Sequence, residues 1–140
     1  MTAHVHGRLP APHLPPAAGL VLRAAAGRWY QETIGPVPVS QRHRIQPWPV
    51  SVYLVTGRDG RIEWLGKADR DPGVAARLDD HLRHPDRRAT FYQVRAVLLR
   101  PDTPPAAVLA LEGKLADVLS LRGWPGRAWP SAAMWPELVA

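Results

Sequence analysis

The 140-residue chain contains no cysteine and no asparagine. Without cysteine it forms no disulfide and offers no thiolate to a metal, which fits a reducing compartment. It has no stretch near the ~20 apolar residues that span a bilayer. Its N-terminal sequence, MTAHVHGRLPAPHLPPAAG, lacks the unbroken apolar run of a signal peptide. We therefore expect a cytoplasmic protein with no membrane-spanning segment.

Basic residues outnumber acidic ones. Eighteen Lys and Arg side chains stand against 12 Asp and Glu, which gives a formal net charge of +6. Such a surplus attracts polyanions, so nucleic acid leads the possible partners, although this charge is a steering field rather than a site. Hydrophobic residues make up 46% of the chain, enough for the core of one small domain of undetermined oligomeric state.

The N-terminal 49 residues are interrupted repeatedly by proline. Residues 1–17 predict a mobile arm, residues 18–33 a short helix, and residues 35–49 an extended linker. Two groups of polar side chains here have two interpretations each, as a ligand site or as solvated chain. They are a possible metal-binding set, His4, His6 and His13, and a possible phosphate-binding set, Arg42, His43 and Arg44.

Residues 50–140 are more regular. Period-2 patterns and β-branched residues predict strands, and 3.6-residue periodicity predicts helices. The predicted elements are a hairpin of residues 50–56 and 61–66, a helix over 72–84, a strand over 90–99 and a second helix. This order predicts a small α/β (α+β) domain with a three-stranded, largely antiparallel sheet flanked by helices.

The second helix has strong end signals. Thr103 is the predicted N-cap, Pro104 the first helical residue and Gly123 the C-terminal stop. Three Trp-Pro pairs follow and predict an irregular tail packed by aromatic rings.

The hairpin carries one large aromatic residue on each strand, Tyr53 and Trp64. A four-residue connection places them directly opposite each other, and a two-residue Asp59-Gly60 turn shifts the pairing by two residues but keeps them on the same face. They are therefore expected to be neighbours, either as core packing or as part of a site.

Three further polar residues lie on predicted helices. Arg77 and His81 are four residues apart, so they share an edge of the first helix, as site residues or as a solvated flank. Glu112 interrupts the apolar stripe of the second helix. A buried carboxylate needs a cation, a metal or hydrogen-bond donors, and Arg77 is one possible structural partner.

These features together resemble the GIY-YIG endonuclease superfamily over about residues 50 to 130. SVY (51–53) and WLG (64–66) stand at the positions and spacing of its two signature triplets. Lys67 follows the second triplet, Arg77 and His81 match the Arg-x-x-x-His of the first helix, and Glu112 matches the single metal-binding Glu. Each triplet is common, but the ordered set is considerably more specific.

The resemblance implies a metal-dependent DNA endonuclease that hydrolyses a phosphodiester with one Mg²⁺ or Mn²⁺. It implies that Tyr53 positions or deprotonates water, Arg77 holds the scissile phosphate and Glu112 holds the metal. Lys67 and His81 would assist, and Trp64 with Gly66 would contact substrate.

The chain departs from the family at two places. Trp64 replaces a Tyr and has no hydroxyl, and no Asn stands near the end, where Ala128 or a neighbour takes the corresponding place. Two alternatives are therefore kept: a non-catalytic nucleic-acid-binding module on this fold, and an enzyme recruited to a different, small-molecule substrate.

Overall fold

The computed structural model describes residues 12–70, 72–122 and 129. The α-helices are α1 (Ala18–Ala26), α2 (Val74–His81), α3 (Pro85–Thr90) and α4 (Pro105–Val118). The strands are β1 (Tyr30–Pro38), β2 (Ser51–Thr56), β3 (Ile62–Ala68) and β4 (Gln93–Leu99). Two 3₁₀ helices, η2 (Gly27–Trp29) and η3 (Val39–Arg44), flank β1.

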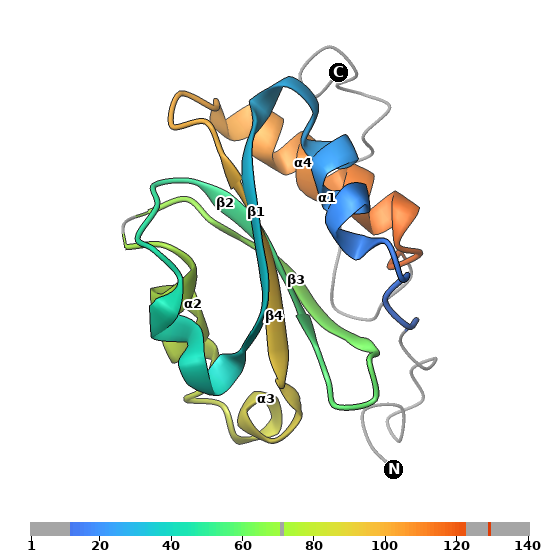
Figure 1. The fold of residues 1–140 in the computed structure, drawn as a ribbon, viewed down its shortest axis with the longest axis vertical. Helices are drawn as coiled ribbons and strands as arrows, with labels where there is room; N and C mark the ends of the chain where they lie inside the picture. Colours follow the sequence, from blue (N-terminus) through green and yellow to red (C-terminus); the bar gives the residue numbers. More distant parts are fainter. Residues whose placement is uncertain (1–11, 71, 123–128, 130–140) are drawn as a thin grey trace.

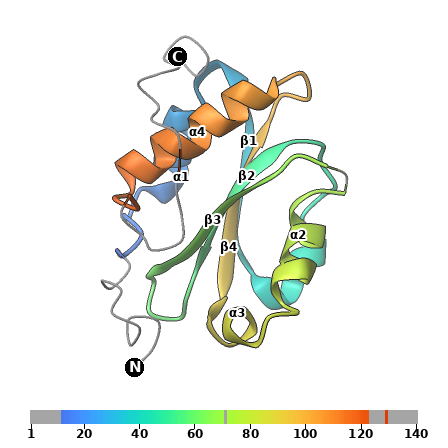
Figure 2. The same ribbon diagram turned by 180° about the vertical axis from the view of Figure 1, so that it is seen from behind.

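The four strands form one antiparallel sheet in the order β1-β4-β2-β3, shown in Figure 1. Helices α1 and α4 cover one face, η3 and α2 lie against the other, and α3 lies next to α2 at one end of β4 (Figures 1 and 2). The protein is therefore a small α+β domain with a four-stranded sheet between two helical layers. Among the described residues, no helix has the length and apolar character needed to cross a bilayer.

Strand β1 corrects the prediction of three strands. The predicted helix over 18–33 ends at Ala26, and residues 30–38 form a strand where a linker was expected from residue 35. Pro36 and Pro38 are tolerated because β1 is an edge strand, bonded on one side only, to β4. Since β1 pairs with β4, the N-terminal part of the chain joins the same sheet as the part after residue 49.

The hairpin of β2 and β3 has the register of a two-residue turn. Tyr53 pairs with Gly66 and Val55 with Trp64, and a bulge follows before Thr56 pairs with Ile62. The two aromatic residues are therefore on one face but not directly opposite each other, as the shorter turn predicts.

The remaining helices differ from prediction mainly at their ends. The predicted helix over 72–84 is α2, and α3 follows it over Pro85–Thr90, of which only Thr90 was expected to lie in the last strand. Helix α4 begins one residue late, with Pro104 as N-cap, while Thr103 Oγ1 donates instead to Arg100 O (2.5 Å). Gly123, Ala128, the Trp-Pro pairs, His4 and His6 lie outside the described residues.

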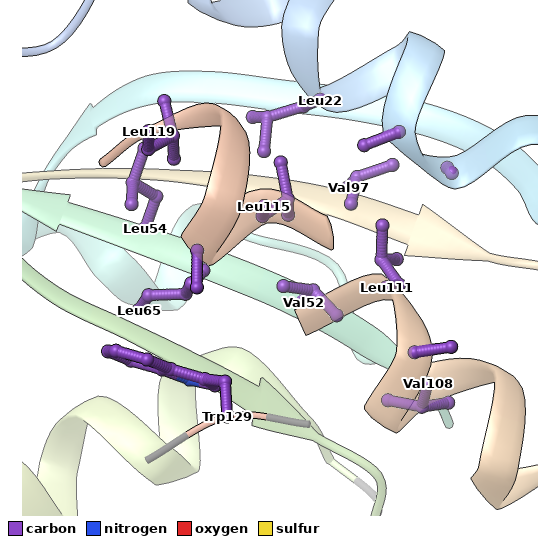
Figure 3. Close-up of a cluster of buried hydrophobic side chains, with 14 of the residues drawn as sticks. Leu22, Val52, Leu54, Leu65, Val97, Val108, Leu111, Leu115, Leu119 and Trp129 are labelled. Atoms are coloured by element: carbon purple, nitrogen blue, oxygen red, sulfur yellow. The ribbon is translucent and has the colours of Figure 1, made fainter. Parts of the chain in front are cut away.

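Aliphatic side chains fill the space between the sheet and the α1/α4 layer, as Figure 3 shows. Val52, Leu54 and Leu65 point from β2 and β3 toward Leu111 and Leu115 of α4. The periodicity of α4 explains this packing, because residues three and four apart share one helix face. The opposite face has a separate, smaller core that includes Tyr53 and Leu78.

Candidate functional site

Tyr53 lies at the centre of the sheet, on the face covered by α2. Alternation along β2 sends Val52 and Leu54 into the core under α4, and Tyr53 and Val55 into the core under α2. The Tyr53 side chain is fully buried. A phenol in this position needs a hydrogen-bond partner, because an unpaired buried hydroxyl is costly.

Gly66 makes room for the two aromatic residues of the hairpin. A Cβ atom at residue 66 would lie 2.9 Å from both Trp64 Nε1 and Tyr53 Oη. Such a separation is shorter than real Cβ contacts, so glycine lets the phenol and the indole approach each other over the strand. The structure thus brings Tyr53, Trp64 and Gly66 together, as expected from the shared face.

His81 completes this group from the last turn of α2. It is 4% exposed, and its Nε2 lies 2.7 Å from Tyr53 Oη. Its Nδ1 lies 3.0 Å from Nη1 of Arg87. Because a guanidinium only donates, Nδ1 accepts from Arg87, so the hydrogen of the neutral imidazole is on Nε2 and is donated to Tyr53 Oη.

Arg87, on α3, is the outer end of this chain of hydrogen bonds. Its guanidinium carbon lies 4.5 Å from the centroid of the Trp64 ring, a cation–π contact. The Trp64 ring also meets His81 edge-on, at 4.6 Å between centroids. The Trp64 indole therefore contacts both the Arg87 guanidinium and the His81 imidazole. These contacts do not need the hydroxyl that a Tyr would have at this position. We call Tyr53, Trp64, His81 and Arg87 the polar cluster.

Arg77 does not join the polar cluster. It is exposed on α2, whereas His81 turns inward, so the shared helix edge does not bring their side chains together. Within the described part of the chain, the Arg77 guanidinium makes no hydrogen bond or ion pair. The possible structural pair between Arg77 and Glu112 is not formed.

Glu112 and Lys67 lie on the other side of the sheet. Glu112 is buried on α4, among helix residues that pack on Val52, Leu54 and Leu65. Lys67 pairs with Val52 and so shares its face, and its Nζ lies 3.0 Å from Asp69 Oδ2. That hydrogen bond holds the pKa of Asp69 below its usual range. The sheet separates both residues from Tyr53.

The described residues do not fit a divalent cation beside Tyr53. The only carboxylate that the family resemblance assigns to the metal is Glu112, behind the sheet. In the described ranges, no three His, Asp or Glu side chains gather as a metal site.

The η3, α2 and α3 layer carries more arginines than aspartates, and four of these arginines are exposed and two half-buried. Residues 39–44 and 74–90 carry six arginines against three aspartates. We call these six the arginine surface: Arg42, Arg44, Arg77, Arg83, Arg87 and Arg88. Arg42 ties η3 to α2 through Asp79 (2.6 Å). The polar cluster lies directly beneath this surface and reaches it at Arg87.

Sequence reasoning missed Arg87. Pro85 at the start of a helix, followed by Asp86 in its first turn, is a helix-start signal that predicts α3. No local pattern shows that the second residue after Pro85 contacts His81 and Trp64, because those contacts are tertiary.

A shallow hollow elsewhere is lined by Tyr30, Gln31, Arg100, Pro101 and Asp102, and none of these belongs to the polar cluster.

Comparison of the chain with protein-family models, with curated proteins and with solved structures finds no match.

Proposed function

We propose that this chain binds nucleic acid by gripping the phosphate backbone with the arginine surface. The observation that carries this proposal is the excess of six arginines over three aspartates on one helical layer. Arginine presents a planar fork of donors that matches phosphate oxygens, and phosphate contacts supply most sequence-independent affinity. DNA is the partner we expect, with no preference for base sequence.

We also propose that β2, β3, β4, α2 and α4 form a GIY-YIG-like core, to which α1 and β1 are added. The order of these elements along the chain supports this, as does the shared position of Tyr53, Trp64, Gly66 and His81 on one face. The separation of Glu112 from that face favours the binding module over the nuclease.

The test is binding of a labelled DNA duplex at a series of salt concentrations. We expect the logarithm of the binding constant to fall linearly with the logarithm of salt, by about 0.9 per phosphate contacted. The double variant Arg77→Glu/Arg88→Glu should weaken binding strongly. Its matched control, Arg23→Glu/Arg28→Glu, makes the same charge change on α1 and η2, away from the arginine surface.

Equal losses in both double variants would show that net charge, not the arginine surface, is responsible. If the wild-type protein does not bind DNA at low salt, the proposal is contradicted and the recruited small-molecule enzyme is favoured.

A second candidate is phosphodiester hydrolysis with Mg²⁺ or Mn²⁺. The hydrogen bond between Tyr53 and His81 favours it, because a phenol next to an imidazole is a pair able to move a proton. Full burial of Tyr53 and the distant position of Glu112 count against it.

Plasmid nicking with Mn²⁺, and with chelator, tests hydrolysis. Metal-dependent nicking that Tyr53→Phe abolishes would establish it. Loss of nicking in Glu112→Gln with an unchanged melting temperature would show that Glu112 takes part in hydrolysis. Absence of nicking in a protein that binds DNA leaves the binding module.

A further inference from the structure

We propose that Arg87 is the phosphate anchor of the arginine surface, a guanidinium fixed in place before any ligand arrives. This inference rests on the proposed function and deepens it, since it assigns the leading contact to one residue. That residue is not Arg77, to which the family resemblance gives the phosphate.

Arg87 is held by two side chains from different elements. Nη1 donates to His81 Nδ1 at 3.0 Å, and the planar head stacks on Trp64 at 4.5 Å. His81 is itself fixed, because it is buried and bonded to the fully buried Tyr53. The guanidinium therefore rests on a rigid support that reaches the central strand of the sheet.

The other arginines of the surface are held differently. Arg42 and Arg83 lie against the carboxylates of Asp79 and Asp80, which offset their charge. Arg44 and Arg88 donate to Gln41 Oε1 and to the Leu82 carbonyl in exposed bonds. Within the described residues, no carboxylate forms an ion pair with Arg87, and its hydrogen-bond partner His81 is buried.

The Arg87 guanidinium keeps further N–H donors that can bind a phosphate. Of the guanidinium nitrogens of Arg87, only Nη1 takes part in a hydrogen bond within the described part of the chain. Nε–H and the Nη2 hydrogens can therefore donate as a fork to two oxygens of one phosphate. An already ordered side chain avoids most of the entropy cost of binding, an effect on the order of tenfold in affinity.

The ligand class is a phosphodiester of nucleic acid. His81 stays neutral when its Nδ1 accepts from Arg87, so it does not compete for the anion. Free inorganic phosphate shares the chemistry of the group, and only the polymer also reaches neighbouring arginines such as Arg88.

The experiment compares Arg87→Gln with Arg88→Gln, an equal charge change one residue further along α3. We expect about a tenfold loss of DNA affinity for Arg87→Gln and about a twofold loss for Arg88→Gln. Arg87→Lys, which keeps the charge but not the fork, should lose nearly as much as Arg87→Gln. Melting temperatures show whether each variant folds.

His81→Phe provides a variant of unchanged charge. It keeps a ring beside Trp64 but removes the acceptor for Arg87. If Arg87 is the phosphate anchor, DNA affinity should therefore fall several-fold. Equal effects of Arg87→Gln and Arg88→Gln, with DNA binding intact, would overturn this inference and leave the proposed function standing.

Nitrogen NMR of the arginine Nε–H groups separates the two proposals further. During titration with a short oligonucleotide, the chemical shift of Arg87 Nε–H should change at lower ligand concentration than those of the other arginines. If wild-type protein fails to bind DNA, the proposed function fails, and titration with inorganic phosphate decides the anchor by itself. A shift at Arg87 larger than at Arg88 supports it, and equal or absent shifts overturn it.

Discussion

The sheet separates two layers of different chemistry. Under α1 and α4, the face is filled mainly by aliphatic side chains, together with the Trp129 ring (Figure 3), and Glu112 is buried on α4. Under η3, α2 and α3, the core holds a phenol, an imidazole and an indole joined by directional contacts, and six arginines lie outside it. Hydrophobic burial is non-directional, so the first layer mainly stabilises the fold, whereas the identity of each residue matters in the second.

Leu115→Ala should have the largest effect of the changes that separate the two layers. Leu115 is fully buried under α4, and its truncation should lower the free energy of unfolding by about 3 kcal/mol. DNA affinity of the folded protein should not change. Chemical denaturation and DNA binding measure the two quantities. Leu109→Ala, 42% exposed on the same helix, is the control and should cost about 0.5 kcal/mol or less.

Gly66→Ala should have the next largest effect, on the opposite layer. The new Cβ would press on Tyr53 Oη and Trp64 Nε1, and overpacking of this kind costs about 1–3 kcal/mol. Thermal and chemical denaturation measure the loss. Gly19→Ala in α1 is the control, because its Cβ would meet nothing closer than 4.0 Å and alanine favours a helix. Equal stability of the two variants would contradict the close approach at Gly66.

Tyr53→Phe is expected to cost less, about 1–2 kcal/mol. It removes one oxygen and leaves the Nε2–H of His81 without its partner, so the loss measures a buried donor rather than a cavity. Tyr92→Phe, on an exposed residue, is the control and should be nearly neutral. A loss no greater than that of the control would show that the hydrogen bond adds nothing to stability.

Features that follow from local patterns could be predicted from the sequence, and features that depend on tertiary packing could not. The shared face of Tyr53 and Trp64 follows from the two-residue period of strands, and the burial of Glu112 follows from helical periodicity. Both are local patterns. Which face of the sheet α4 covers is a tertiary property that no local pattern records. The family resemblance implies that Glu112 shares a site with Tyr53, whereas the structure has Glu112 on the opposite side of the sheet.

Strand β1 and the Arg87 contacts were missed for related reasons. Pro36 and Pro38 end most strands, but an edge position accepts them, and only the sheet order shows that β1 is an edge. Arg87 meets His81 and Trp64 through tertiary contacts between α3, α2 and β3, which no local pattern predicts. Composition predicted a basic protein, and the fold decided which layer carries the arginines.

Arg77→Gln should have the smallest effect on stability and still separate the layers. Arg77 is exposed and makes no side-chain hydrogen bond within the described ranges, so the free energy of unfolding should change by about 0.5 kcal/mol or less. If Arg77 contacts one phosphate, the log–log salt slope of duplex binding should fall in magnitude by about 0.9. Arg23→Gln, on α1, removes the same charge from the opposite layer and should leave the slope unchanged. A slope that falls equally in both variants would mean that DNA senses the net charge of the whole protein, and the division of labour between the two layers would then apply to stability alone.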